Sequence, residues 1–345
     1  MSKPPSPSEI AWMKAHAADT RVPDMIATTV ICSVASTAFV VLRFVSRRMA
    51  CIKPRLNDWL LVVSLMLYLG FAIGFACATL YGAGRHIILL KSQHRPNIRS
   101  INISDQVLYF VALAFVKFSI LSLYIVIFPG RVMRWSAIVI GVIIAALTTA
   151  TTLMAIFRCV PMSWIWDPTV TDPRCIQFSV LVLAHGISNI VTDLIIFAMP
   201  IHPILKLKMP KDEKVYVLLS FLLGASACIA SIVRTAYTLD LDSTSDPTWD
   251  DMPVSMVSLG EIMAGILAAC LPTYGPLVHY ISHKKKRSGD RPEYRSAVRI
   301  TPDDSGELMM SKDDTYKGAR NTEVSMMSKD DTYKGAHNTE VTMTN

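Results

Sequence analysis

Long apolar stretches alternate with short polar ones over the first 281 residues of this chain. Each apolar stretch has about the 20 residues that an α-helix needs to cross a hydrocarbon core of ~30 Å. Because lipid offers no hydrogen bonds to the backbone, stretches of this length predict helices rather than strands. The predicted spans are residues 25–45, 59–80, 104–128, 135–157, 178–199, 215–239 and 252–281.

The charges between the spans indicate on which side of the membrane each loop lies. Basic residues gather in the loops after the first, third and fifth spans, and residues 284–287 directly after the seventh are all basic. The loop over 240–251 has five aspartates and no basic residue, whereas the basic loop after the second span argues the other way. By the positive-inside rule, the balance predicts an outside N-terminus and a cytoplasmic C-terminus.

The two ends of the chain differ from the middle. Residues 1–24 form a predicted extracellular tail without the apolar core of a cleavable signal peptide, and residues 25–281 form the transmembrane domain. Residues 282–345 lack an apolar block, which predicts a disordered cytoplasmic tail. This tail repeats 17 residues in tandem (309–325 and 326–342), either as a docking or phosphorylation motif around Ser311 and Ser328 or as a duplication without a role.

Composition supports the same class of protein. Hydrophobic residues make up 52% of the chain, charged residues 18%, and the mean hydropathy is +0.39. The net charge of +7 falls mainly at one predicted membrane face, so it indicates orientation rather than nucleic-acid binding. No glycine-rich phosphate loop and no Cys-x-x-Cys spacing stands in the sequence, and we expect no nucleotide or metal site.

Ionisable residues inside the spans are costly in lipid and therefore informative. At a rise of ~1.5 Å per residue, Lys117 in the third span and Asp193 in the fifth both lie about 20 Å from the outer surface. Equal depth predicts a buried Lys117–Asp193 ion pair. Such a pair would neutralise both charges and hold two helices together.

A second polar set lies nearer the predicted outer surface. His185, Asn189 and Asp193 recur at every fourth position and share one helical face. Arg234 and Glu261 lie about 9 Å and about 13 Å from the outer ends of their spans. One interpretation is an outward-facing polar pocket, lined by His185, Asn189, Arg234 and Glu261, that holds a small ligand or substrate. The other is that these charges only lock the helix packing.

Two features of the predicted outer loops depend on the compartment. Cys159 and Cys175 flank the loop after the fourth span, where an oxidising environment favours a disulfide, although two free thiols are the alternative. The other five cysteines lie in or beside apolar blocks and are expected to be packing residues. Asn102 begins an N-glycosylation sequon, Asn102-Ile103-Ser104, which lies outside but close to the membrane.

Several short stretches within residues 22–281 together match, in their order along the chain, the pattern of one known protein family. They are Asp58-Trp59 and the segments YGAGRH (81–86), KFSIL (117–121), CVPMSWIWD (159–167), CI (175–176), NIVTD (189–193) and EIMAGILAACLP (261–272). In these stretches the chain resembles the fungal rhodopsin-domain family of integral membrane proteins, which includes receptor-like proteins and a satratoxin-cluster membrane protein. The resemblance implies a seven-helix, rhodopsin-like, all-α bundle, but it does not fix the chemistry.

The expected cofactor of a light-sensing rhodopsin has no attachment point here. Retinal needs a lysine in the seventh helix, and residues 252–281 contain none, so no cofactor is expected. The leading hypothesis is a receptor-like multi-pass membrane protein of the plasma membrane or an endomembrane. It would bind a small molecule from the outer side and act through a cytoplasmic signalling partner, in secondary metabolism or surface sensing.

Two other functions stay open at this point. The first is a membrane-embedded enzyme or accessory factor of a natural-product (mycotoxin) pathway, acting on a pathway intermediate, in which Glu261, Asp193 and His185 would transfer protons. The second is a transporter, which is less favoured because seven spans do not divide into equal repeats. The sequence alone names neither the ligand nor the oligomeric state.

Overall fold

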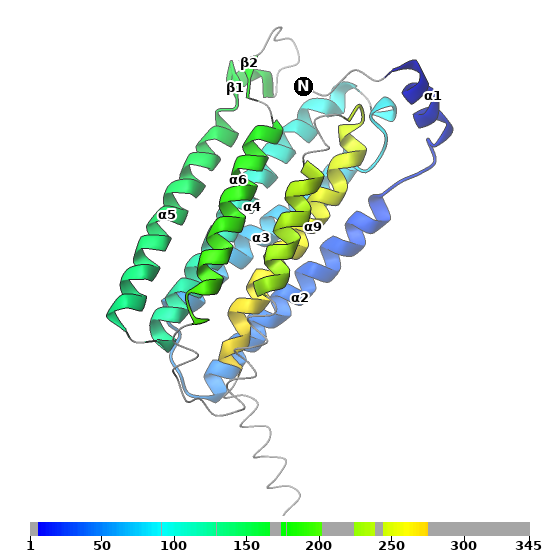
Figure 1. Cartoon of the computed structure of the whole chain (residues 1–345). Coiled ribbons are helices and arrows are strands. Elements are labelled where there is room, and N and C mark those ends of the chain that lie inside the picture. Colours follow the sequence, from blue (N-terminus) through cyan, green and yellow to red (C-terminus); the bar gives the residue numbers. More distant parts are fainter. Residues whose placement is uncertain are drawn as a thin grey trace, which may run out of the picture. The chain divides into compact units, whose positions relative to one another are not determined.

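Helices make up most of the part of the chain that the structure, a computed structural model, describes (Figure 1). This part comprises residues 6–90, 92–128, 130–165, 174–176, 178–201, 224–238 and 244–274. Its six candidate membrane spans are α2 (Val22–Met49), α3 (Leu56–Leu80), α4 (Arg95–Ile127), α5 (Arg131–Ile156), α6 (Phe178–Ala198) and α9 (Pro247–Cys270), which the 3₁₀ turn Leu271–Thr273 continues. These six correspond to the predicted spans one to five and seven.

The predicted sixth span and the C-terminal tail lie partly or wholly outside the described residues. Within the span, residues 224–238 are helical, whereas residues 215–223 are not described. Residues 275–345, which include the end of the predicted seventh span and the tandem repeat, are not described either. The count of seven spans, the N-out orientation and the disordered tail therefore stay predictions.

Five of the six helices begin earlier than hydropathy predicted, and α4 and α9 differ the most. α4 begins at Arg95 rather than at residue 104, and α9 begins at Pro247 rather than at residue 252. Both starts have proline in the first turn, a position that proline favours because its missing N–H is not needed there. Hydropathy marks where a helix enters lipid and not where it begins. Asp250 and Asp251, assigned to a loop from the sequence, therefore lie in α9.

The N-terminal segment also contains a helix that the sequence analysis missed. In α1 (Pro7–Ala15), the Glu9 amide donates to Ser6 Oγ (3.3 Å) and the Ser6 amide donates to Glu9 Oε2 (2.6 Å). This reciprocal capping box satisfies two amides that a helix start would otherwise leave unpaired. The pattern Ser-Pro-x-Glu at residues 6–9 was the available signal.

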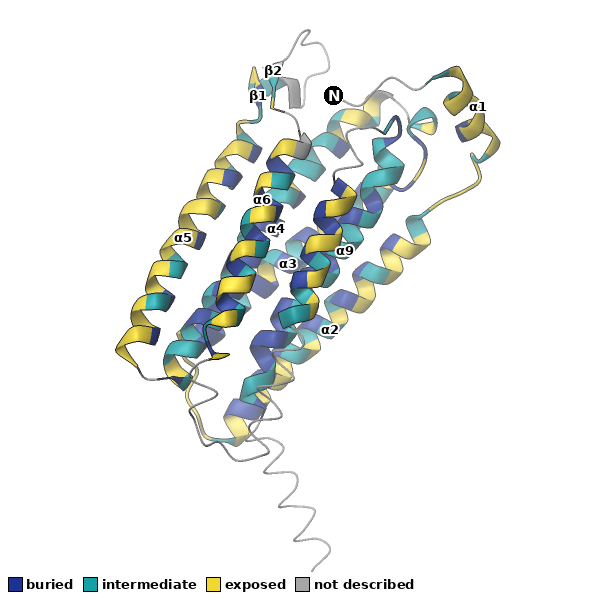
Figure 2. Cartoon of the chain, viewed as in Figure 1, coloured by how far each residue is buried: buried dark blue, intermediate teal, exposed yellow. Residues whose placement is uncertain are grey.

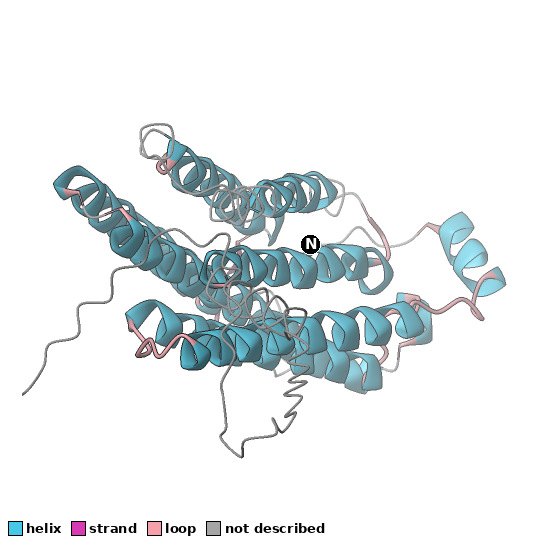
Figure 3. Cartoon of the chain, turned by 90° about the horizontal axis from the view of Figure 1, so that it is seen from below, coloured by secondary structure: helices cyan, strands magenta, loops and turns pink. Residues whose placement is uncertain are grey.

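The long helices pack side by side (Figures 1 and 3), with α3 against α4, α4 against α5, and α2 against α9. Aromatic and aliphatic side chains of α3, α4 and α9 form the main core, including Phe71, Phe75, Phe110 and Ile262. Figure 2 shows exposed positions along the long helices, and the exposed apolar residues include Ile31, Met66 and Val142. Water would penalise such a surface, whereas lipid tails accommodate it.

One end of the bundle is tied together by a glycine turn. Gly82 and Gly84, directly after α3, have φ values of +104° and +83°, which side chains with a Cβ rarely adopt. The Gly84 amide donates to the Thr248 carbonyl (3.1 Å), and the Arg21 amide donates to the Gly84 carbonyl (3.0 Å). The turn thus joins the end of α3 to the beginnings of α2 and α9.

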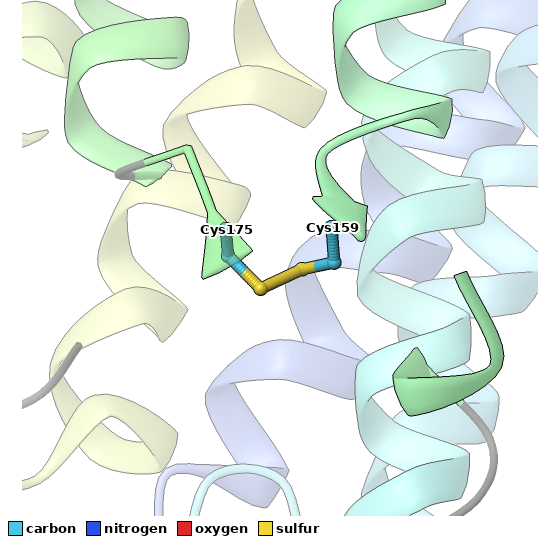
Figure 4. The surroundings of a disulfide bond; sticks show 2 residues. All are labelled: Cys159 and Cys175. Carbon is cyan, nitrogen blue, oxygen red and sulfur yellow. A yellow bond between two sulfur atoms is a disulfide. The ribbon is translucent and has the colours of Figure 1, made fainter. Parts of the chain in front are cut away.

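The same end contains the single disulfide that the described residues form. β1 (Cys159–Val160) pairs antiparallel with β2 (Arg174–Cys175), and the Cys159 and Cys175 sulfurs are bonded (Figure 4). We call this end of the bundle the disulfide end, and the other the far end. A disulfide fits an oxidising compartment, as the predicted N-out orientation requires.

Candidate functional site

Glu261 of α9 is the centre of a buried polar network between the helices. Tyr109 Oη donates to Glu261 Oε2 (2.6 Å), and Arg234 Nε donates to the same oxygen (3.2 Å). Asn189 Nδ2 donates to Glu261 Oε1 (2.8 Å), and the Ser231 hydroxyl bonds to that oxygen as well. The side chain of Glu261 is 1% exposed. Four partners therefore neutralise and fix a carboxylate that would be costly if unpaired.

Aromatic rings complete this network on the side of α4. The His185 ring stacks on Phe110, with ring centres 3.8 Å apart, and meets the Tyr109 ring edge-on at 5.8 Å. The Arg234 guanidinium lies 5.0 Å from the centre of the Tyr109 ring, within the range of a cation–π contact. Two buried atoms, Arg234 Nη2 and His185 Nδ1, have no hydrogen-bond partner among the described residues.

Lys117 of α4 is anchored to α6. Its Nζ lies 2.9 Å from Asp193 Oδ1 and donates to Thr192 Oγ1 (2.7 Å) and to the Asn189 carbonyl (3.1 Å). An ammonium group has three protons, and all three have an acceptor here. Asn189 Nδ2 also donates to Asp193 Oδ2 (3.2 Å), which connects this pair to the Glu261 network. The arrangement favours a structural role for Lys117.

The structure thus brings together the six polar residues that the sequence analysis singled out in the spans. They are His185, Asn189, Arg234, Glu261, Lys117 and Asp193. Most of them bind one another rather than line one pocket. Two members of the network, Tyr109 and Ser231, were missed. Tyr109 lies eight residues before Lys117, on the same face of α4, and this spacing could have pointed to it.

A cavity lies between α3, α4 and α9 at the disulfide end, and we call it the disulfide-end cavity. Aromatic side chains, including Phe71, Phe75 and Tyr109, form its walls. Its charged lining residues are Asp105, Asp251 and Arg234. Protein atoms leave about 610 Å³ of space in it, part of which is open to the surroundings. Of the four predicted pocket residues, Arg234 alone lines this cavity.

The other predicted pocket residues and the predicted Lys117–Asp193 ion pair line two different spaces. Glu261, Lys117 and Asp193 border a larger, mostly apolar cavity at the far end, where protein atoms leave about 1000 Å³ of space, part of it open to the surroundings. His185 and Asn189 border a smaller one between α4, α5 and α6. The wall of the far-end cavity includes Pro200 and Gly224, which adjoin residues 202–223 outside the described part. We therefore argue the candidate site from the disulfide-end cavity.

A second buried ionic cluster fastens α2 to α3 and α9. Arg43 Nε and Arg47 Nε lie 2.8 Å and 2.9 Å from Asp58 Oδ1. Asp58 Oδ2 accepts from the Arg55 amide (2.8 Å) at the start of α3, and Arg43 Nη1 donates to the Ala269 carbonyl (2.6 Å). Arg43 and Asp58 are both 0% exposed. The cluster is therefore a structural connection between three helices.

A third cluster fixes the beginning of α9 at the disulfide end. His86 Nδ1 lies 2.6 Å from Asp246 Oδ2, and the Ile87 amide donates to Asp246 Oδ1 (3.0 Å). The His86 ring stacks on Trp249 at 4.5 Å and meets Trp12 of α1 edge-on at 5.6 Å. These contacts hold the helical turn that carries Asp251, a wall residue of the disulfide-end cavity.

The structure also shows where the predicted glycosylation site, Asn102, lies. Asn102 lies within α4, half-buried, and lines the disulfide-end cavity. A glycan is bulky and belongs on an open surface, so the structure gives glycosylation at Asn102 no support.

Within the described ranges, no three His, Cys, Asp or Glu side chains are grouped as a metal site.

Six apolar helices, lipid-compatible outer faces and a buried polar interior define a multi-pass helical membrane protein, as predicted. The chain belongs to the fungal rhodopsin domain family, whose domain matches residues 42–280. This confirms the family resemblance seen in the sequence.

Three relatives show what kinds of protein the chain is similar to. A SAT4 family membrane protein of Emericella nidulans is 28% identical over 228 residues, which are 65% of this chain and 58% of the relative. The satratoxin biosynthesis SC1 cluster protein 4 of Stachybotrys chartarum is 26% identical over 48% of this chain and 60% of its own. Receptor GIN3 of Arthrobotrys oligospora is 22% identical over 50% and 42%. In each case the chain spans less than two thirds of the relative.

Proposed function

We propose that this protein is a receptor-like membrane protein that binds a small molecule in the disulfide-end cavity, which opens to the outer side of the membrane. The observation that carries this proposal is the lining of the cavity. It combines aromatic walls with three charged side chains, of which Asp105 and Asp251 have no hydrogen bond or ion pair with another described residue. Apolar walls with a few convergent polar groups are typical of ligand sites.

The path from this cavity to the far end supports a receptor. Arg234 lines the disulfide-end cavity and binds Glu261, which in turn lines the far-end cavity. A ligand that moves the Arg234 guanidinium would therefore act on the Glu261 network between the helices. Allosteric signalling needs such a differential contact at one site that biases an arrangement elsewhere. One relative is itself named a receptor.

A host experiment separates sensing from catalysis. The gene is deleted and complemented with wild type, with Ser255→Phe, which fills the cavity from α9, or with Val142→Phe on the lipid-facing side of α5. Small molecules are then profiled by mass spectrometry. We expect deletion and Ser255→Phe to change the timing or total output of metabolites equally, and Val142→Phe to behave as wild type. Accumulation of one pathway intermediate at normal expression would contradict a receptor.

A membrane-embedded enzyme or accessory factor is the second candidate. Its support is that one relative is named for a biosynthetic cluster, together with the grouping of His185, Asp193 and Glu261. Against it stands the geometry of Glu261, whose two oxygens both accept hydrogen bonds from protein groups. A general acid or base must reach a substrate proton, and this carboxylate is already occupied. The receptor proposal therefore has the stronger support.

A further inference from the structure

Assuming the proposed function, we infer that the disulfide-end cavity takes an aryl-alkyl amine: a cationic amine between Asp105 and Asp251, an aromatic body, and an oxygen acceptor facing Arg234. The inference names the chemical class of the ligand. It rests on the two carboxylates, on an unpartnered guanidinium nitrogen, and on the spacing between them.

The carboxylates supply the first half of the site. Asp105 of α4 is 7% exposed, and Asp251 is also partly covered. Every other acidic side chain at the buried centre of the bundle has a cationic partner: Glu261 has Arg234, Asp193 has Lys117, and Asp58 has Arg43. Asp105 and Asp251 have none among the described residues, so the cavity has two carboxyl groups without a counter-charge. An organic cation would supply that counter-charge and favour their ionised form, whereas an anion would not.

The guanidinium of Arg234 supplies the other half. Its Nε binds Glu261, whereas its Nη2 is buried without a hydrogen-bond partner among the described residues. Leaving a buried donor unsatisfied costs about 1–3 kcal/mol, which a ligand acceptor would recover. Because Glu261 already neutralises the charge of Arg234, a hydroxyl or carbonyl oxygen suits this donor better than a second anion.

The height of each group in the bundle sets the length of the ligand. Asp105 lies 22 residues before the end of α4 at Ile127, and Asp251 lies 22 residues before Thr273, roughly 33 Å from the far end in both helices. Tyr109 lies one turn deeper, about 6 Å below Asp105, and the Arg234 guanidinium covers its ring. The amine and the oxygen must therefore stand at opposite ends of a body about one aromatic ring long.

The walls fit such a body. Besides the charged residues, the lining of the cavity includes Phe71, Phe75, Tyr109 and Phe110, with Met252 and Val254 from α9. Aromatic walls favour a flat apolar ligand through stacked or edge-on contacts. They also lower the access of water to the carboxylates, which strengthens their attraction for an ammonium group.

Gly74 of α3 positions the Asp105 carboxylate. A Cβ added at residue 74 would lie 2.9 Å from Asp105 Cγ and closer still to its Oδ1. The carboxylate therefore lies directly against the backbone of α3. Gly74→Ala consequently moves the carboxylate without removing its charge, which provides a second variant to set beside the charge-removing Asp105→Asn.

The test uses the purified full chain in lipid nanodiscs and isothermal titration calorimetry. The probe is 4-hydroxyphenethylamine, with 4-(2-hydroxyethyl)phenol as its neutral isostere and phenethylamine as the analogue without the oxygen. We expect the neutral isostere to bind at least about tenfold more weakly, and phenethylamine about tenfold more weakly. Asp105→Asn and Gly74→Ala should each weaken binding of the amine about tenfold, and exposed Asp24→Asn should not.

Two results would overturn the inference. If the neutral isostere binds as tightly as the amine and Asp105→Asn changes nothing, the ligand is not a cation, and the receptor proposal survives. If none of the three probes binds to a wild-type chain that unfolds cooperatively, aryl-alkyl amines are not the ligand class. In that case the host experiment with Ser255→Phe still decides the proposed function, so the two failures are distinguishable.

Discussion

Glu261→Gln is expected to lower the free energy of unfolding by about 3–5 kcal/mol, because it leaves the Arg234 guanidinium buried without a counter-charge. Arg234 is 2% exposed and cannot turn to water within the bundle. The substitution keeps the shape of the side chain but also reduces its capacity to accept hydrogen bonds from Tyr109 and Asn189. Thermal unfolding of the detergent-solubilised protein, followed by circular dichroism, measures the change.

The partner variant provides the control for this prediction. In Arg234→Met/Glu261→Gln both charges are absent, so the double variant should be more stable than Glu261→Gln alone. A coupling energy near zero in this double-mutant cycle would show that the ion pair contributes nothing. The Glu261 network would then not be the connection between the two cavities that the receptor proposal requires.

Asp58→Asn should have an effect of similar size, about 3–5 kcal/mol, at a separate place in the bundle. Asp58 is the shared counter-charge of Arg43 and Arg47, and it also accepts from the Arg55 amide at the start of α3. The variant therefore leaves two buried guanidinium groups without a carboxylate. We expect a loss of folded protein during purification or a clearly lower unfolding temperature.

Asp24→Asn is the matched control for Asp58→Asn. It makes the same chemical change at an exposed position in the first turn of α2, where the effect should stay within about 0.5 kcal/mol. Equal unfolding temperatures for the two variants would contradict a structural role for the Asp58 cluster.

Hydropathy predicted six of the described helices because lipid imposes a simple requirement of length and apolar character. The same depth argument placed Lys117 level with Asp193, and the structure has the two groups 2.9 Å apart. Helix starts at Arg95 and Pro247 could not be found in this way, because a helix continues into the polar region without a change in hydropathy. Proline in the first turn was a local sign that both starts share.

The candidate site was harder to predict than the helices. Asp105 and Asp251 stand close to the predicted membrane boundary. A charged residue there can be solvated by water, so the sequence gives no reason to single these two out. Their lack of a partner emerges only when α3, α4 and α9 are packed together. Likewise, the hydrogen bond from Arg43 to the Ala269 carbonyl joins residues 226 positions apart, which no local pattern reveals.

Cysteine accessibility tests most directly whether the disulfide-end cavity is an outward-facing ligand site. Ser255→Cys places a thiol in the cavity wall of a chain in which Cys51 and Cys77 are replaced by alanine, and sealed spheroplasts are treated with a membrane-impermeant thiol reagent. The account predicts labelling from the outside, slowed by 4-hydroxyphenethylamine. Labelling only after the cytoplasmic face is exposed would contradict an outward-opening cavity, and with it the receptor-like function.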